Sequence, residues 1–542
     1  MTIHDDLEYL FEFNGARRLT VGLDREAIEV HARSDRRLQL AVSEALKIHR
    51  ELQKTHLSLL RLDEKKQIEF LQEGFINFYG PDAVNPYVPL AAAGPWIIST
   101  CGAVIFDAGG YGMLGQGHNP KDVLDALTQP QVMANIMTAS FQHREFIDAL
   151  RAEIGHTRGG IGPSMQEPFK AFLCLNSGSE AVTLCMRIAD TNAYNLLAAG
   201  GRHAGKKSRF VAFKGGFHGR TDRPAQVSDS CLATYKRTLA SFSQLDNLIT
   251  IVPNDSAALE EVFERAEKEG FFIEALLFEP VMGEGNPGLA LEPAYYKRAR
   301  ELSIAHGSML IIDAIQAGIR TYGVLSIVDY PGFQELEPPD METYSKALNA
   351  GQFPMSVVAF GPRAKDLYVR GTYGNTMTAN PRALAVACTV LRSLNADLRQ
   401  NIVQRGHEIL QKLGRLAAEF PDVIEKVQGT GLLFSVAINP KVFKVVGHGG
   451  LEEFLRMKGL GVIHGAANSL RYTPPFDLTS LQVDLIESSL RHAILFAPRN
   501  GADHSGGAHS GNTPSGRDSG RGKAPSSFSA ADATCDDEVA CR

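Results

Sequence analysis

Short apolar runs alternate with amphipathic segments through the middle of the chain. Met309–Ile312 is an unbroken apolar run that ends on Asp313, which is typical of a strand buried on both faces of a parallel sheet. Similar runs stand at Phe172–Leu175, Phe210–Phe213 and Ala275–Phe278, and each is followed by a turn and a helical or glycine-rich segment. This alternation predicts an α/β fold, with a large domain whose mainly parallel sheet is flanked by helices.

The first 80 residues show a helical periodicity instead. Apolar residues recur three or four positions apart in two runs, which are Leu38, Val42, Ala45, Leu46 and Leu52, and then Ile68, Leu71 and Phe75. Prolines at positions 81, 86 and 89 end the pattern. We interpret this segment as a helical extension that packs on the main body or on a partner subunit.

The chain after residue 390 combines a long helical pattern with the apolar segments GLLFSVAI and LRYTPPF, which predicts a smaller α+β domain. From Arg499 the composition shifts to Gly, Ser, Ala, Asp and His, and such a segment has too little apolar surface to offset the entropy of ordering. We therefore predict four parts: a helical extension (1–80), a large α/β domain (81–390), a small α+β domain (391–498) and a disordered tail (499–542).

Composition narrows the class of protein. Of the 542 residues, 44% are hydrophobic and 21% charged, with a net charge of -6, which gives no general attraction to nucleic acid or to acidic membranes. No apolar run approaches the roughly 20 residues that span a bilayer, and the acidic start does not resemble a signal peptide. The seven scattered cysteines favour a reducing cytoplasm. Cys535 and Cys541 lack a nearby His, so we expect no metal site.

Polar or glycine residues follow each predicted strand directly. Since parallel strands end at one edge of a sheet, four segments are expected to converge there, namely Ser177–Ser179, Phe217–His218, Glu279–Glu284 and Asp313–Gln316. The NSGSE turn stands before a helix, where free N–H groups can hold a phosphate. The same turn also suits a plain helix cap, and Phe217 suits either a stacked heterocycle or the core.

Asp313 and Lys346 add a specific chemistry to this edge. Lys346 stands between Pro338–Pro339 and Gly351, which predicts a loop near the same edge. An acid that holds a pyridine nitrogen protonated and a lysine that forms a Schiff base are the two groups that pyridoxal phosphate needs. An Asp at a strand end can also be a simple helix cap.

Eight segments, in order, resemble the class III pyridoxal-phosphate aminotransferases of fold type I, nearest to the ω-aminotransferases of ornithine, lysine and aminobutyrate. The likeness covers roughly residues 85–495. The segments are LGQGHNP (114–120), LNSGSEAV (175–182), GGFHGRT (215–221), EPVMGEG (279–285), LIIDAIQAGIRTYG (310–323), SKALNAG (345–351), NTMTANP (375–381) and LRYTPP (470–475).

The resemblance implies a role for each matching residue around the cofactor. Lys346 is expected to form the Schiff base and to move the proton, and Asp313 to pair with the ring nitrogen. Gln316 is expected to bond the phenolic oxygen, and Phe217 and Ile315 to lie on the two ring faces. Ser177, Gly178 and Ser179 are expected to bind the phosphate, together with Thr376 from the neighbouring subunit of a homodimer. His218 and Glu279 complete the expected cofactor site.

Three further residues are implied in substrate binding. Arg471 matches the family arginine that binds a carboxylate of the substrate. Glu284 matches the glutamate that pairs with this arginine when no α-carboxylate is present. Arg220 matches the position that binds a second carboxylate. The chain departs from the family pattern in having Ala314 after Asp313, and Thr378 and Ala379 where two glycines are common. A surface or structural ion pair is the alternative for each arginine.

We thus predict a cytoplasmic, homodimeric aminotransferase that moves an amino group from an ω-amine donor to 2-oxoglutarate by a ping-pong mechanism. One alternative is an aminomutase, epimerase or decarboxylase on the same scaffold, which would need no stoichiometric oxo acid. Another is a catalytically silent relative that serves as a binding or assembly partner through residues 1–80. The presence of Asp313, Gln316 and Lys346 together argues against the second alternative.

Overall fold

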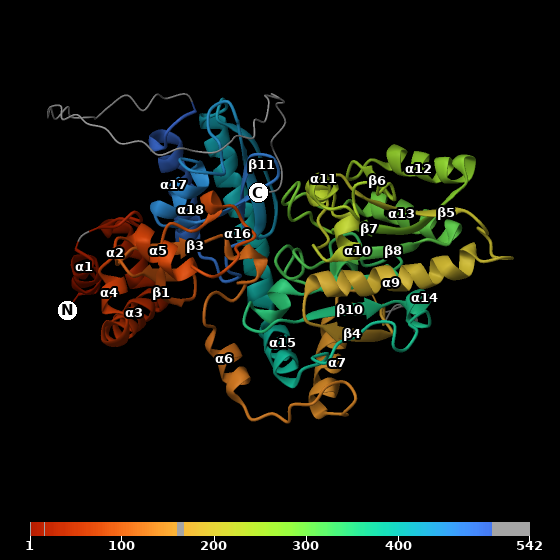
Figure 1. The fold of residues 1–542 in the computed structure, drawn as a ribbon, viewed down its shortest axis with the longest axis horizontal. Coiled ribbons are helices and arrows are strands. Elements are labelled where there is room, and N and C mark those ends of the chain that lie inside the picture. Colours follow the sequence, from red (N-terminus) through yellow and green to blue (C-terminus); the bar gives the residue numbers. More distant parts are fainter. Residues whose placement is uncertain (1, 16, 160–166, 501–542) are drawn as a thin grey trace, which may run out of the picture.

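The structure, a computed structural model, describes residues 2–15, 17–159 and 167–500. It forms two lobes, one around a large sheet and one that joins the N-terminal helices to the C-terminal elements (Figure 1). The predicted tail lies outside the described residues from position 501 onward, as do Cys535 and Cys541. Among the described residues, no helix combines the length and the apolar character needed to cross a lipid bilayer.

The large sheet has seven strands in the order β4-β10-β9-β8-β7-β5-β6. β9, β8, β7, β5 and β6 run parallel, and β10 is antiparallel to both of its neighbours, β9 and β4. The predicted mainly parallel α/β fold is confirmed. The bounds are β4 (Ala171–Leu175), β5 (Lys207–Phe213), β6 (Leu248–Ile251), β7 (Phe271–Phe278), β8 (Met309–Asp313), β9 (Met341–Tyr344) and β10 (Ser356–Phe360).

Helices cover both faces of this sheet, which explains its continuous apolar strands. Along β8, Leu310 and Ile312 pack in one core with α12 and α13, whereas Met309 and Ile311 pack in a second core with α9. The helices of this lobe are α9 (Gly178–Leu197), α10 (Asp222–Val227), α11 (Asp229–Thr238), α12 (Ser256–Glu269), α13 (Pro293–His306) and α14 (Pro362–Lys365); α6 (Lys121–Thr128), α7 (Phe141–Glu153) and α15 (Pro381–Ser393) lie beside it.

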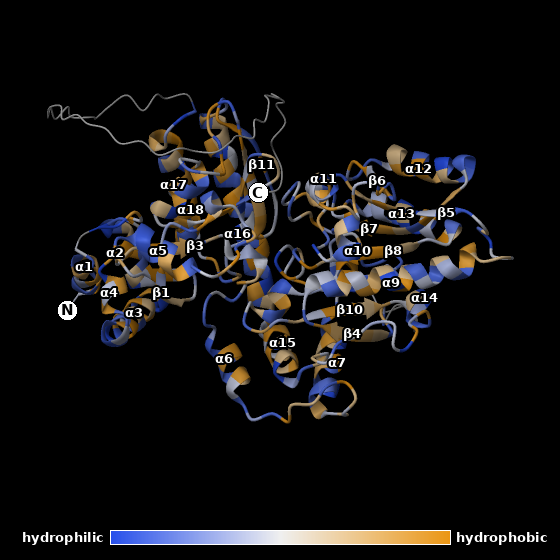
Figure 2. Cartoon of the chain, in the orientation of Figure 1, coloured by the Kyte–Doolittle hydropathy of each residue, from blue (hydrophilic) through white to orange (hydrophobic). Residues whose placement is uncertain are grey.

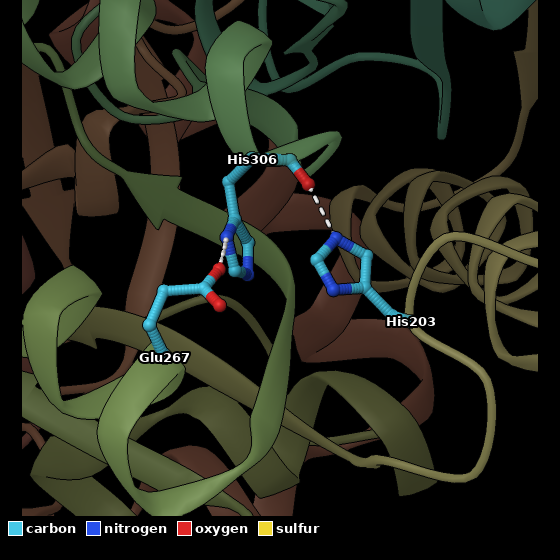
Figure 3. A group of neighbouring side chains, drawn as sticks. All are labelled: His203, Glu267 and His306. Atoms are coloured by element: carbon cyan, nitrogen blue, oxygen red, sulfur yellow. Dashed lines mark hydrogen bonds and ion pairs between the residues drawn. The ribbon is translucent and has the colours of Figure 1, made fainter.

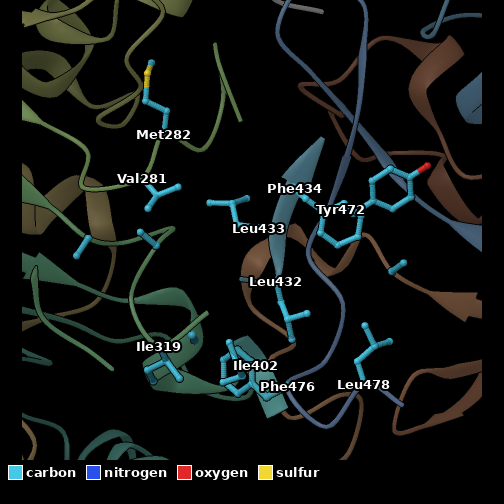
Figure 4. Close-up of a cluster of buried hydrophobic side chains, with 14 of the residues drawn as sticks. Val281, Met282, Ile319, Ile402, Leu432, Leu433, Phe434, Tyr472, Phe476 and Leu478 are labelled. Carbon is cyan, nitrogen blue, oxygen red and sulfur yellow. The ribbon is translucent and has the colours of Figure 1, made fainter. Parts of the chain in front are cut away.

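The C-terminal part contains a four-stranded sheet in the order β11-β12-β15-β14, against which the long helix α16 packs. Buried side chains of this part meet those of the large lobe in one core, where Val281 and Ile319 lie near Leu433 and Ile402 (Figure 4). The bounds are α16 (Ala396–Glu419), β11 (Ile424–Thr430), β12 (Leu433–Ile438), α17 (Leu451–Met457), β13 (Leu460–Gly461), β14 (Ile463–Gly465), β15 (Ser469–Tyr472) and α18 (Ser480–Phe496).

The N-terminal helices pack on a small sheet, β1-β2-β3-β13, that joins the two ends of the chain. Hydropathy follows this packing, with apolar residues concentrated on inner strands and helix faces (Figure 2). The bounds are α1 (Ile3–Phe13), α2 (Arg25–Ser34), α3 (Arg36–Thr55), α4 (Leu57–Leu60), α5 (Glu64–Gln72), β1 (Pro89–Ala93), β2 (Trp96–Ser99) and β3 (Val104–Asp107).

The two predicted apolar runs of the extension differ in outcome. Leu38 and Val42 of α3 are buried as predicted. The second run does not form one helix face buried against the main body, because α5 ends at Gln72, Leu71 is 47% exposed, and Phe75 lies beyond the helix and is 82% exposed. Helical spacing reports which residues share a face, but it does not say whether another element covers that face.

Candidate active site

Asp313 ends β8 and is buried at the carboxyl edge of the large sheet. Its Oδ1 accepts hydrogen bonds from Thr343 Oγ1 at 3.0 Å and from the backbone N–H of Ile315 at 3.2 Å, and its Oδ2 lies 3.0 Å from Nδ1 of His218. Three partners from three segments therefore fix the orientation of this carboxylate.

A second buried carboxylate, Glu279, completes this network. It accepts the backbone N–H groups of Phe217 at 3.0 Å and Gly283 at 2.8 Å. Burial raises the pKa of Glu279 to about 7. Although burial opposes it, the hydrogen bond and the charge of Asp313 raise the pKa of His218 above its ordinary value. The loops after β5, β7 and β8 are thus joined by buried hydrogen bonds, which are stronger in a low dielectric than in water.

Lys346 comes two residues after the end of β9, in a short 3-10 turn at Lys346–Asn349 rather than in an open loop. Thr343 pairs in register with Asp313, so the lysine comes three residues beyond the partner of the acid. Desolvation lowers the pKa of Lys346 to about 8, and Arg471 adds to the effect, while Glu284 opposes it. No hydrogen bond or ion pair from a described residue engages the amine, which leaves it available for chemistry.

The start of α9 forms a cradle of the kind that holds a phosphate. Ser177 caps the helix, and the N–H groups of Gly178 and Ser179 have no acceptor among the described residues. A Cβ on Gly178 would come within 2.6 Å of Ile315, and a Cβ on Gly219 within 2.3 Å of the Ser179 hydroxyl. Gly219, which also has a positive φ of 118°, allows the loop after β5 to approach the start of α9 this closely, whereas a side chain at position 178 would displace Ile315.

Arg471 lies in β15 of the C-terminal part and reaches across to the large lobe. Its Nη1 donates to the carbonyl of Gly283 at 2.6 Å and lies 3.0 Å from Glu284 Oε1 and 3.3 Å from Gln316 Oε1. Although burial opposes it, Arg471 and Lys346 hold the pKa of Glu284 below its ordinary value. The buried Nε of Arg471 has no partner among the described residues, so the guanidinium retains a donor for a further ligand.

Arg220 and Phe217 lie on the outer side of this site. The Arg220 Cζ is 5.4 Å from the centre of the Phe217 ring, and its Nη1 donates to the Tyr235 hydroxyl at 3.2 Å. Thr376 is exposed, and its neighbour Asn375 accepts a hydrogen bond from Asn176 of the same chain at 3.1 Å. The NTMTANP turn therefore lies against the start of α9.

Sequence reasoning missed several side chains of this region. Thr343 fixes Asp313, and Tyr79 and Tyr111 have charged neighbours that include Arg471. Tyr111 has a left-handed backbone with φ of 47° between two glycines of positive φ, and the GYG triplet was the one signal that could have drawn attention to it. Thr343 had no signal, because only strand pairing brings it to Asp313.

These residues fit pyridoxal phosphate. Asp313 would face the ring nitrogen, the start of α9 would hold the phosphate, and the unpartnered amine of Lys346 would bond the aldehyde carbon. The tight contact at Gly178 shows that Ile315 leans toward the phosphate cradle. The donor set of one acid, one amine and two free backbone N–H groups matches the chemistry of this cofactor.

A second cluster of ligand-type side chains, His203, Glu267 and His306, lies at the far end of α9 (Figure 3). His203 donates from Nε2 to the His306 carbonyl at 2.8 Å, and His306 Nε2 accepts from the N–H of Ile273 at 3.4 Å. The proton of His306 is thus on Nδ1, 3.3 Å from Glu267, whose other oxygen lies 3.3 Å from the Lys206 ammonium. We interpret this cluster as a structural hydrogen-bond network.

Comparison with known proteins matches residues 79–494 to the family described as Aminotransferase class-III. The chain is 28% identical over 426 residues to ornithine aminotransferase 2 of Staphylococcus aureus strain Mu50, covering 77% of this chain and 97% of that protein. It is 29% identical over 378 residues to acetylornithine aminotransferase of Xanthomonas axonopodis pv. citri, covering 69% and 84%. The ornithine aminotransferase structure of Toxoplasma gondii ME49 superposes with a TM-score of 0.67 at 22% identity, covering 82% and 98%.

Proposed function

The chain belongs to the class III aminotransferases, which use pyridoxal phosphate, and we propose that it transfers an amino group from an ω-amine of the ornithine, lysine or 4-aminobutyrate type to 2-oxoglutarate. The observation that carries the donor class is the 3.0 Å ion pair between Arg471 and Glu284. This pair neutralises the carboxylate-binding arginine while the carbon of the donor that bears the reacting nitrogen carries no carboxylate. The ornithine and acetylornithine aminotransferases among the relatives support the same donor class.

In the proposed mechanism, pyridoxal phosphate supplies the electron-withdrawing ring that carries the amino group between the two substrates. Lys346 removes the proton from the donor carbon that bears the nitrogen, since its lowered pKa of about 8 leaves much of the amine neutral near that pH. Asp313, fixed by Thr343 and His218, holds the ring nitrogen protonated. The oxo product of the donor leaves before the oxo acid enters, which gives ping-pong kinetics.

The ion pair between Arg471 and Glu284 also supports 2-oxoglutarate as the proposed acceptor. When an α-carboxylate enters, Glu284 releases Arg471, whose unpartnered Nε and its Nη groups then form a two-pronged bond to the carboxylate. Arg220 takes the second carboxylate of 2-oxoglutarate on the outer side of the site. Two arginines at the two ends of one substrate favour a dicarboxylic oxo acid over pyruvate.

We also propose a homodimer in the cytoplasm. Apolar side chains stand exposed together on one segment beside α7, which is the kind of surface that a second subunit covers. They are Val132, Met133, Ile136, Met137 and Phe141. The five described cysteines are unpaired, which supports a reducing compartment. Size-exclusion chromatography with light scattering tests the dimer.

A donor and acceptor screen tests the function. Holoenzyme is mixed with ornithine, lysine, 4-aminobutyrate or alanine, and then with 2-oxoglutarate or pyruvate, while cofactor absorbance and amino acid products are followed. We expect ω-amines to be consumed and glutamate to form in equal amounts. Turnover of a donor without stoichiometric consumption of an oxo acid would instead identify an aminomutase, epimerase or decarboxylase.

A further inference from the structure

Arg320 is a fully buried cation that has no role in the proposed mechanism. Its side chain is completely shielded from solvent, and among the described residues no carboxylate forms an ion pair with it. Burial lowers the pKa of Arg320 to about 9, although the charge of Asp107 opposes the shift. Since a buried charge without a paired counterion is costly, the contacts of Arg320 are where a function is expected.

The Arg320 guanidinium joins the loop after β8 to two other backbone segments. Its Nη1 donates to the carbonyl of Pro474 at 2.5 Å, and its Nη2 donates to the carbonyl of Gly112 at 3.3 Å. Its Cζ lies 5.1 Å from the centre of the Phe476 ring. One planar side chain therefore binds both the turn Gly110–Gly112 and the segment that follows β15.

Thr473 binds the same turn through its other polar group. The Thr473 Oγ1 accepts the N–H of Gly112 at 3.1 Å and donates to the carbonyl of Gly109. The N–H of Thr473 donates to the carbonyl of Ala108 at 2.7 Å, which fixes the threonine beside the turn. Both backbone polar groups of Gly112 are thus bonded to the side chains of buried residues, Arg320 and Thr473.

Gly112 brings this turn against the side chain of Lys346. Its φ is 75°, and a Cβ built on it would lie 3.4 Å from Cδ of Lys346, which is an ordinary van der Waals distance. Tyr111, the residue before it, has a φ of 47°, and Ile319, the residue before Arg320, has a φ of 66°. A left-handed backbone is rare for a β-branched residue such as isoleucine and stores strain, which is common at functional sites.

We propose that Arg320 and Thr473 are positioning residues that hold the turn Gly110–Gly112 against the side chain of Lys346 and exclude water from its amine. A turn fixed at both polar groups of Gly112 leaves no space for water along the lysine stem. Poor solvation favours the neutral amine, which is the form that reacts. The proposal rests on the proposed function for the role of Lys346, and it explains how the chain prepares that residue.

The reactivity of Lys346 toward acetic anhydride tests the proposal without turnover. The full chain without cofactor is labelled over a pH series, and acetylation of Lys346 is measured by mass spectrometry. We expect a midpoint near pH 8 in the wild type. Thr473→Val and Arg320→Met should each raise the midpoint by about one pH unit, because water then reaches the amine. At pH 8 this shift lowers the rate of labelling about fivefold.

Four charged groups act on the Lys346 amine, and all of them remain in these variants. They are Glu284, Arg471, Asp313 and Glu279. Arg320→Lys keeps the charge but lacks the planar fork, so it should shift the midpoint as Arg320→Met does. This variant separates the position of the turn from the loss of a positive charge.

Two further variants serve as controls. Thr473→Ser keeps the hydroxyl and should restore the wild-type midpoint. Arg300→Lys changes another buried arginine, whose partner Asp340 lies 2.9 Å away, just before the start of β9 and so at the amino edge of the sheet. It should keep the midpoint near pH 8, which shows that the change at Arg320 is not a general effect of altering a buried cation.

A midpoint that stays near pH 8 in Thr473→Val or in Arg320→Lys overturns the proposal, as does an equal shift in Arg300→Lys. If the Arg320 variants fail to fold, Thr473→Val and Thr473→Ser still decide it. In the holoenzyme, Thr473→Val should lower kcat for amino transfer several-fold, with little change in KM for the amine. If the wild type transferred no amino group, the proposed function would fail, and the labelling would still decide the role of Arg320 and Thr473.

Discussion

Thr343 donates a hydrogen bond from Oγ1 to Oδ1 of Asp313 at 3.0 Å, and the two residues are register partners on the parallel strands β9 and β8. Because Lys346 comes three residues after Thr343, the register of one strand pair places the acid and the lysine at the same edge of the sheet. A slip of one residue would turn Thr343 to the other face. The proposed chemistry therefore depends on the pairing of two short strands.

Lys346→Ala should abolish amino transfer, with a loss of at least about a thousandfold, because Lys346 is the proton carrier of the proposed mechanism. The measurements are steady-state transfer and the visible absorbance of the bound cofactor, which should no longer respond to added amine. Lys365→Ala on the exposed end of α14 is the control. Turnover at the wild-type rate in Lys346→Ala would refute the assignment.

The rate at which cofactor-free protein captures pyridoxal phosphate should rise with pH and level off above about pH 8. Only the neutral amine attacks the aldehyde, and desolvation lowers the pKa of Lys346 to about 8. Each pH unit below that value leaves about tenfold less neutral amine. The Glu284 charge acts to raise this pKa, so Glu284→Gln should move the break to lower pH. Stopped-flow absorbance checks both results, and a break that stays near pH 10.5 would contradict them.

Asp313→Asn should lower the rate of amino transfer by about 10² to 10⁴-fold, because a neutral amide does not hold the ring nitrogen protonated. The fold should persist, since the amide oxygen can still accept from Thr343 at the same position. Circular dichroism and thermal melting verify the fold, and Asp366→Asn at an exposed site serves as the control. Activity within a factor of two of wild type would count against the proposed role.

Arg471→Lys should raise KM for 2-oxoglutarate by about ten- to a hundredfold with a smaller effect on the ω-amine half-reaction. An ammonium cannot form the two-pronged bond to a carboxylate that a guanidinium forms. Separate measurement of the two half-reactions distinguishes the effects. Arg298→Lys on the surface of α13 is the matched control, and equal losses in both half-reactions would indicate a structural role for Arg471.

Stability should fall as the pH rises, in part because of Glu342. Burial raises its pKa to about 8 from an ordinary value of 4.5, so the folded state binds more protons than the unfolded state between about these two pH values. The unfolding free energy therefore decreases with pH across this window. Glu342→Gln, which can keep the bonds to Ser326, Ile327 and Tyr344, should show a flatter Tm between pH 5 and 8 than wild type. Glu264→Gln, an exposed change on α12, should follow the wild-type curve.

Local pattern was sufficient for most of the large sheet. The apolar run at Met309–Ile312 is a strand because helices cover both of its faces, and NSGSE is the start of a helix because Ser177 and Glu180 cap it reciprocally. The family segments also indicate Lys346 and Asp313 as the candidate lysine and acid of the site. Local sequence patterns predict these elements correctly because an apolar run indicates a buried strand and a capping pair indicates a helix start, and each pattern lies within a single segment.

The sequence alone thus determined the α/β class, and it predicted the strand ends, the acid and the lysine from which the proposed site is built. Only the tertiary structure decided that β10 runs antiparallel, that Arg471 reaches Glu284, and that Phe78 of the extension meets Arg220. Hydrophobic periodicity shows which residues of a helix or strand form an apolar face. Which other element covers that face depends on how segments distant in the sequence pack together. For this reason the exposure of Phe75 and the proximity of Tyr79 to the site could not be derived from local pattern.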